Sequence, residues 1–152
     1  MKQLGLLAVL FIPALVSAAE YVGNAHGIAM VSALQRETFQ LASGTLGDCK
    51  TSGTQSTYRV CALVNASMTL SNSTGQSQVI PVIKVMISDY ATDHGAILRD
   101  YIFSGLWADT KVGINDEFSL ELHERKAFPG RLWGNLDFHG YHMSYGIEAA
   151  LD

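Results

Sequence analysis

The amino-acid sequence predicts an all-β protein: a single-domain antiparallel β-sandwich or small β-barrel of about seven to eight strands with one disulfide. Three observations support this prediction. Apolar and polar residues alternate along several segments, turn-forming residues separate these segments at short intervals, and charged residues make up only 16% of the chain. An average soluble domain has about 25% charged residues, and strands joined by short connections are expected to be antiparallel neighbours.

Residues 1–18 are expected to be a removable signal peptide. Lys2 gives a positive start, an apolar run extends from Leu4 to Val16, and small residues follow at the expected cleavage site after Ala18. The apolar run is shorter than the roughly 20 residues that cross a bilayer, so we do not expect a membrane-spanning protein. The sequence therefore predicts one β domain over residues 19–152, secreted or periplasmic. The whole chain has a formal charge of −4, and removal of residues 1–18, which include Lys2, would leave a domain with a formal charge of −5.

The segment Ile28–Ala42 is ambiguous. The spacing of its first apolar residues fits a helix, whereas Thr38 to Leu41 alternates like a strand. We expect a strand that pairs with the segment Tyr58–Leu70 across a loop at Gly44–Thr57.

The clearest alternation lies within Tyr58–Leu70, where every second residue is apolar. This pattern predicts a strand with one buried face. The buried face is expected to consist of Tyr58, Val60, Ala62, Val64, Ala66, Met68 and Leu70. The almost wholly apolar segment Val79–Ile87 follows turn-forming residues 71–77, so we expect it to form a hairpin with the first strand. Pro81 cannot donate a ladder hydrogen bond and is expected near the start of its strand or at an edge.

Further strands are expected downstream, between turn signals. They are Ala96–Phe103, Leu106–Ile114, Phe118–His123, Arg131–Phe138 and Tyr141–Ala149. Turns are expected at Asn115-Asp116, Pro129-Gly130 and His139-Gly140, with a positive φ at each of the two glycines.

Cys49 and Cys61 are the only two cysteines and lie in a turn-rich stretch. In an oxidising compartment such a pair usually forms a disulfide. The alternative, a catalytic thiol, requires an activating neighbour, and neither cysteine has one close in sequence. We therefore expect a Cys49–Cys61 disulfide.

A metal or proton-transfer site is one interpretation of the stretch from Asp137 to His142. A two-residue turn at His139-Gly140 would place Asp137 opposite His142, close enough for the two side chains to interact. His139, or a third ligand such as His123 or His94, would complete a set that could bind a metal or orient a proton transfer. The alternative is an exposed polar pair at the tip of a hairpin, because the spacing matches no established zinc signature.

Trp133 and Trp107 are the expected ligand-binding residues, because an exposed indole offers a broad apolar face with one donor. Trp133 alternates with apolar Leu132 and is expected to face outward, and Trp107 shares its predicted face with charged residues. Tyr141, which the same two-residue turn would bring opposite Phe138, completes the ligand-binding set. Packing of the tryptophans in the core is the alternative.

These observations predict an exported, non-enzymatic binding or interaction module for a protein, glycan or small-molecule ligand, without a cofactor. One alternative is a small metal-dependent or general acid/base enzyme that uses Asp137, His139 and His142. A second is a small outer-membrane β-barrel, which alternating strands would also suit, although Lys84 and Arg99 interrupt the apolar strands. Nucleic acid is not an expected partner, because the chain is acidic and its basic residues are scattered.

Overall fold

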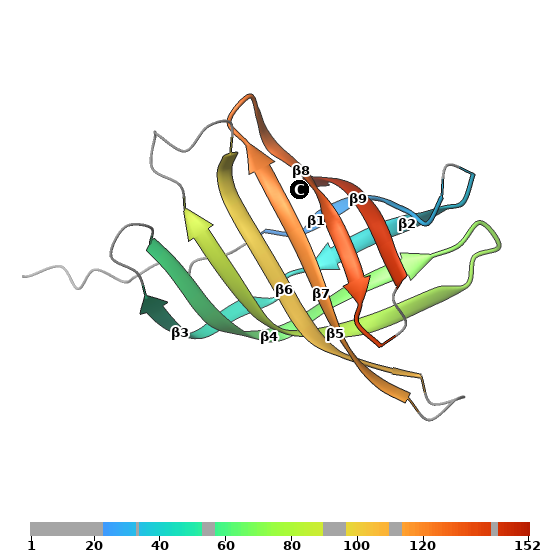
Figure 1. Ribbon diagram of the computed structural model, residues 1–152, viewed down its shortest axis with the longest axis horizontal. Helices are drawn as coiled ribbons and strands as arrows, with labels where there is room; N and C mark the ends of the chain where they lie inside the picture. Colours follow the sequence, from blue (N-terminus) through green and yellow to red (C-terminus); the bar gives the residue numbers. More distant parts are fainter. Residues whose placement is uncertain (1–22, 33, 53–56, 90–96, 110–113, 141–142) are drawn as a thin grey trace, which may run out of the picture.

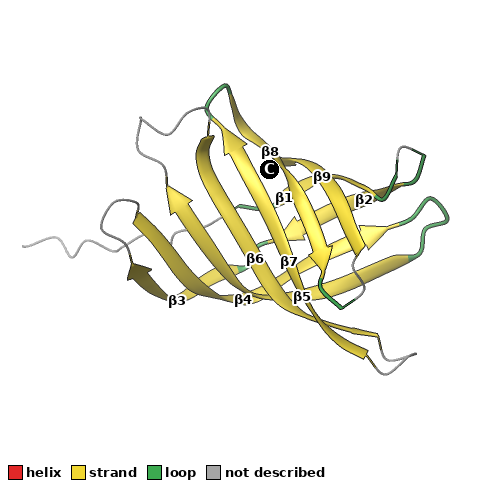
Figure 2. Cartoon of the chain, in the orientation of Figure 1, coloured by secondary structure: helices red, strands yellow, loops and turns green. Residues whose placement is uncertain are grey.

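The fold is a closed antiparallel β-barrel (Figure 1). The computed structural model describes residues 23–32, 34–52, 57–89, 97–109, 114–140 and 143–152. All regular structure in these residues is strand (Figure 2). The nine strands are β1 Ala25–Met30, β2 Arg36–Ala42, β3 Thr45–Ser52, β4 Thr57–Ser71, β5 Ser77–Asp89, β6 Ile97–Asp109, β7 Ile114–Arg125, β8 Phe128–Phe138 and β9 Met143–Leu151.

From β3 to β9 each strand pairs with the next strand in the sequence, and β1 pairs with β2 and with β9 to close the ring. Strands β2 and β3 behave as one bent strand, because both pair with β4 and the register does not shift between the pairs Thr38–Ser71 and Thr45–Val64. The bend lies at Gly44, whose φ of 60° is a left-handed conformation that favours glycine. The closed barrel thus contains eight strands, within the predicted number.

Inward-facing apolar side chains fill the barrel. The largest fully buried ones, all below 2% exposed, are Phe39, Phe103, Phe118, Met68, Ile80, Leu120, Leu122, Leu132, Leu136, Ile147, Val85 and Cys61. An eight-stranded barrel is just wide enough for side chains to fill its interior. The described residues therefore form a continuous apolar core.

The strand predicted at Tyr58–Leu70 is confirmed as part of β4, but half of its predicted buried face is wrong. Ala66, Met68 and Leu70 are buried as expected, whereas Val64 is 49% exposed and Cys61 is completely buried. The register of β4 against β5 shifts between Ala62 and Ala66. A β-bulge at this shift adds residues to one strand and reverses which side chains point inward.

The pairing of β4 with β5 confirms the predicted hairpin. Pro81 lies near the start of β5, before the pairing of β5 with β6 begins at Lys84. Its position agrees with the prediction, because no ladder bond to β6 is required there.

Several predicted boundaries were wrong, because local turn signals do not always end a strand. The segment Ile28–Ala42 forms two strands, β1 and β2, and part of the predicted loop at Gly44–Thr57 forms β3. Strand β6 continues through the expected break between Phe103 and Leu106. Residues Asn115-Asp116 lie within β7 and Pro129-Gly130 within β8, although Gly130 does have the expected positive φ, at 79°.

The predicted disulfide joins β3 to β4. Cys49 and Cys61 are direct cross-strand partners with a Cα–Cα distance of 4.0 Å. Cys49 is exposed and Cys61 is buried. The bond therefore fixes strand β3, whose only pairing among the described strands is with β4, to the wall of the barrel.

Removing this disulfide with the double substitution Cys49→Ala/Cys61→Ala is expected to lower the free energy of unfolding by about 3 kcal/mol, because the unfolded chain would regain the entropy of a short closed loop. Urea unfolding of the oxidised protein and of the variant measures the difference. Equal unfolding midpoints would contradict the expectation. Reduced wild-type protein is the matched control and should behave like the variant.

Candidate functional site

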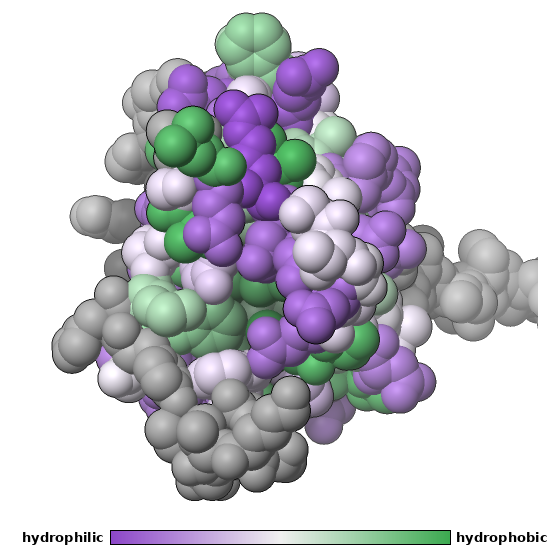
Figure 3. Space-filling view, turned by 90° about the vertical axis from the view of Figure 1, so that its right-hand side faces the viewer, coloured by the Kyte–Doolittle hydropathy of each residue, from purple (hydrophilic) through white to green (hydrophobic). Residues whose placement is uncertain are grey.

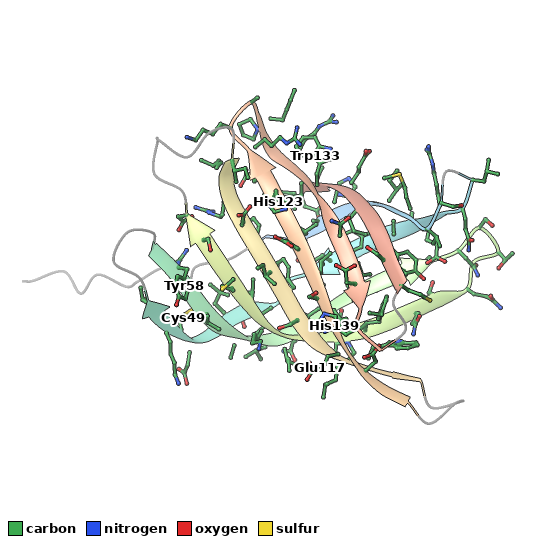
Figure 4. The ribbon with its side chains drawn as sticks, viewed as in Figure 1. Cys49, Tyr58, Glu117, His123, Trp133 and His139 are labelled. Carbon is green, nitrogen blue, oxygen red and sulfur yellow. A yellow bond between two sulfur atoms is a disulfide. The ribbon has the colours of Figure 1, made fainter. Side chains whose placement is uncertain are left out.

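The outer wall formed by β7, β8 and β9 carries aromatic, basic and acidic side chains. Trp133 of β8 lies on this wall, with His123 of β7 and Glu148 of β9 as its direct cross-strand neighbours. His123 and Trp133 lie on adjacent strands in Figure 4. Because buried Leu132 flanks the half-buried Trp133 on its own strand, the indole faces outward.

Two side chains support the Trp133 ring from the β7–β8 side. The guanidinium carbon of Arg125 lies 5.2 Å from the indole centroid, within cation–π range. The ring of Phe128 meets the indole edge-on, with 5.9 Å between centroids. These contacts restrict the rotation of the indole and hold it at the surface.

A groove of about 260 Å³ runs along β9 beside Trp133. Its lining residues are His26, Gly27, Ile28, Arg131, Leu132, Trp133, Glu148, Ala149 and Ala150. Its walls come from β8 and β1, and the small side chain of Ala150 separates Arg131 from His26 across the strands. The groove thus combines an indole, a guanidinium, a carboxylate and an imidazole.

His123 forms a second polar cluster on the same wall. Its Nδ1 lies 2.5 Å from Oδ1 of Asp100, and its Nε2 lies 3.7 Å from Oε1 of Glu121. The carboxylate of Asp100 therefore holds the imidazole through Nδ1, and that of Glu121 lies near the other ring nitrogen. This arrangement orients His123 next to Trp133.

Trp107 faces the other way. It packs against the core, and its ring meets that of Phe138 with 5.3 Å between centroids. The prediction that it shares an outward face was wrong, because β6 continues through Gly105 and the alternation of Tyr101 and Phe103 places Trp107 inside.

The predicted cross-strand pairs at the β8–β9 turn were also wrong. Asp137 pairs with Ser144 and Phe138 with Met143, so the turn is longer than two residues. Gly140 does not have the expected positive φ; its N–H donates instead to both carboxylate oxygens of Asp116, at 2.7 and 2.8 Å. Tyr141, His142 and His94 lie outside the described residues.

His139 and Asp137 line the same hollow, of about 440 Å³. The Nε2 atom of His139 lies 3.1 Å from Oγ of Ser119, which is the cross-strand partner of Asp137. Within the described ranges, no group of three or more His, Cys, Asp and Glu side chains is placed to hold a metal ion.

Sequence reasoning missed a charged network inside one end of the barrel. The carboxylate of Asp89 contacts Nε of Arg99 and lies 3.3 Å from Nη2 of Arg59. Arg99 donates a hydrogen bond to the hydroxyl of Tyr101 at 3.3 Å. Glu124, which is only 7% exposed, accepts a hydrogen bond from the N–H of Gly130 at 2.8 Å. Alternation within the predicted strand Ala96–Phe103 places Arg99 on the same face as Tyr101, but Arg99 was interpreted only as an interruption of the apolar pattern.

Burial raises the pKa of Tyr101 above its ordinary value, although the hydrogen bond from Arg99 opposes the shift. The folded protein therefore retains this proton at a pH where the unfolded chain loses it. The contribution of Tyr101 to stability is complete below the unfolded pKa of about 10 and is lost as the pH rises toward the higher folded pKa.

Stability is accordingly expected to fall above about pH 10 and to fall less steeply in Tyr101→Phe. Urea unfolding at several alkaline pH values measures both slopes. Some slope should persist in the variant, because burial also raises the pKa of Tyr145. Identical slopes for the two proteins would show that Tyr101 does not carry the effect.

Comparison with protein-family models, curated proteins and solved structures finds no match to this chain. Across the residues that the structure describes, there is no helix of the length and apolarity needed to span a membrane. The disulfide is consistent with an extracytoplasmic location.

Proposed function

We propose that this chain is an exported, non-enzymatic binding module that holds its ligand in the groove along β9. The observation that carries the proposal is Trp133, an outward indole supported by Arg125 and Phe128 and flanked by a groove with both donors and acceptors. Export is supported by the signal-like residues 1–18 and by the disulfide.

The filled interior supports a site on the outer wall. Inward side chains such as Phe103 and Leu136 are at most 1% exposed, so a ligand inside the described core would have to displace them. Polar and apolar side chains are interspersed over the described part of the barrel end seen in Figure 3. The groove at Trp133, by contrast, brings an indole, a guanidinium, a carboxylate and an imidazole together in one place.

The groove has fewer carboxylates than glycoside hydrolysis requires. Glu148 is the only carboxylate among the described residues that line it. Glycosidases place their two carboxyl groups roughly 5–5.5 Å or 6.5–9.5 Å apart.

The outward charges of β7, at Glu117, Glu121 and Arg125, oppose a lipid-facing outer-membrane barrel.

The proposal is tested by filling the groove with the substitution Ala150→Trp. Wild-type protein is immobilised and probed with a panel of soluble polysaccharides and with a random peptide library. Ala62→Trp, at an exposed alanine on β4, is the matched control. Binding that is lost in Ala150→Trp and kept in Ala62→Trp supports the proposal. Binding that survives Ala150→Trp, or no binding to any probe, would overturn it.

A second candidate function is acid/base hydrolysis at Ser119 and His139. A hydroxyl within hydrogen-bond reach of an imidazole is the pair that general-base activation of a nucleophile requires. Hydrolysis of p-nitrophenyl acetate by wild-type protein and by Ser119→Ala is the test. Activity that disappears in the variant supports this candidate, and equal rates would exclude it.

A further inference from the structure

The groove has the width of two strand spacings. Arg131, Ala150 and His26 form one cross-strand row over β8, β9 and β1, and Trp133, Glu148 and Ile28 form the next. Neighbouring strands lie about 4.8 Å apart, so the two walls are separated by roughly 10 Å at the backbone. Ala150 leaves this space open at its floor. A single ring-shaped ligand unit, or a chain of such units, fits a trough of this form.

The chemistry of the groove is mixed. Trp133 presents an apolar ring, the guanidinium of Arg131 has only donors, and the carboxylate of Glu148 has only acceptors. A ligand that satisfies all three has an apolar face together with groups that both donate and accept hydrogen bonds. Sugar rings have this combination, because their C–H groups lie on one face and their hydroxyls project around the rim.

Other ligand classes fit this groove less well. Strand β9 is hydrogen-bonded on both sides, to β8 and to β1, so an extended peptide finds no free strand edge to join along the groove. A nucleic-acid backbone would meet the carboxylate of Glu148 on a chain of formal charge −4. A lipid chain would displace part of the solvent around Arg131 and Glu148 without supplying polar partners of its own.

The Trp133 ring is held in place before any ligand arrives. Arg125 and Phe128 contact the indole from the β7–β8 side, while the groove lies along β9. A ring that is already ordered loses little rotational freedom on binding, which favours stacking of a weakly interacting ligand.

Building on the proposed function, we infer that the ligand is a saccharide, one ring of which stacks on Trp133 while its hydroxyls bind Arg131 and Glu148. The groove is open to solvent, because Arg131, Glu148 and His26 are all exposed. An internal unit of a polysaccharide can therefore enter it as readily as a chain end.

The two tryptophans of the chain make the test direct. In Trp107→Phe, the remaining fluorescence comes from Trp133 alone, and in Trp133→Phe it comes from Trp107. A soluble β-glucan, a xylan, a pectin and a chitooligosaccharide serve as probes. Saturable quenching or a blue shift is expected in Trp107→Phe with at least one probe, and no change is expected in Trp133→Phe.

Affinity electrophoresis through gels containing the same polysaccharides gives a second readout that does not depend on the core substitution at Trp107. Retardation of the wild-type protein is expected to disappear in Trp133→Ala. Arg131→Ala is expected to weaken affinity by about tenfold or more, as the loss of a hydrogen bond to a charged group does. Arg36→Ala, which removes an exposed arginine of β2 outside the groove, is the control and should keep wild-type affinity.

The outcomes separate this inference from the proposed function. No saccharide response in either assay overturns the saccharide inference. If a peptide-library ligand then binds and is blocked by Ala150→Trp, the groove is still a binding site and only the ligand class is wrong. If neither saccharide nor peptide binds, both the inference and the proposed function fail.

Discussion

Gly134→Ala is expected to lower the free energy of unfolding by about 3 kcal/mol or more, a cost typical of severe overpacking. A Cβ atom at this position would lie 1.7 Å from the backbone oxygen of Glu121 and 3.0 Å from Cα of Leu122. Backbone atoms cannot rotate away as a side chain can. Strands β7 and β8 would therefore have to separate where Gly134 pairs with Leu122.

Gly47→Ala is the matched control for this prediction. Its added Cβ would make only ordinary contacts, the nearest at 3.5 Å from Ala62. The change should stay within about 1 kcal/mol, because alanine also restricts the unfolded chain. Urea unfolding of both variants measures the two effects. A Gly134→Ala protein as stable as Gly47→Ala would refute the close approach of β7 and β8.

Phe118→Ala is expected to cost about 3–5 kcal/mol, the usual range for truncation of a buried aromatic side chain. Phe118 is only 1% exposed, and its ring centroid lies 6.3 Å from that of Phe138. Its ring also fills the space over Gly105, where an added Cβ would meet it at 2.9 Å. Truncation would leave a cavity that the rigid barrel wall cannot close.

Phe128→Ala removes the same number of atoms from a side chain that is 55% exposed. It should cost about 1 kcal/mol or less, in line with surface substitutions. Thermal and urea unfolding measure both variants. A Phe118→Ala effect no larger than that of Phe128→Ala would contradict the placement of Phe118 in the core.

The sequence was sufficient to predict an all-β fold, a disulfide and most strand positions, because alternation and cysteine spacing are local signals. It was not sufficient to predict that the side chain of Val64 in β4 faces outward. A β-bulge depends on how two strands align. Its sequence signal is a single residue, Asn65, whose φ of 59° is left-handed. The same limitation hid the continuity of β6 through Gly105.

The candidate site was predictable only in part. Alternation with Leu132 correctly predicted that Trp133 faces outward. The groove beside it could not be predicted, because it depends on the pairing of β9 with β1, which joins residues from opposite ends of the chain. The inward charges of Arg99 and Glu124 were also missed, since charged residues on a strand usually mark its solvent face and not a network at the end of a barrel.

Closure of the barrel by its first and last strands also has a consequence for how the chain folds. Ala25 pairs with Leu151, so the ring of hydrogen bonds cannot be completed until the final strand has emerged. Until then β1 and β8 would each present an unpaired edge, the kind of surface on which chains aggregate. The nine residues of β9 would therefore decide whether a growing sheet becomes a closed barrel or remains open to neighbouring chains.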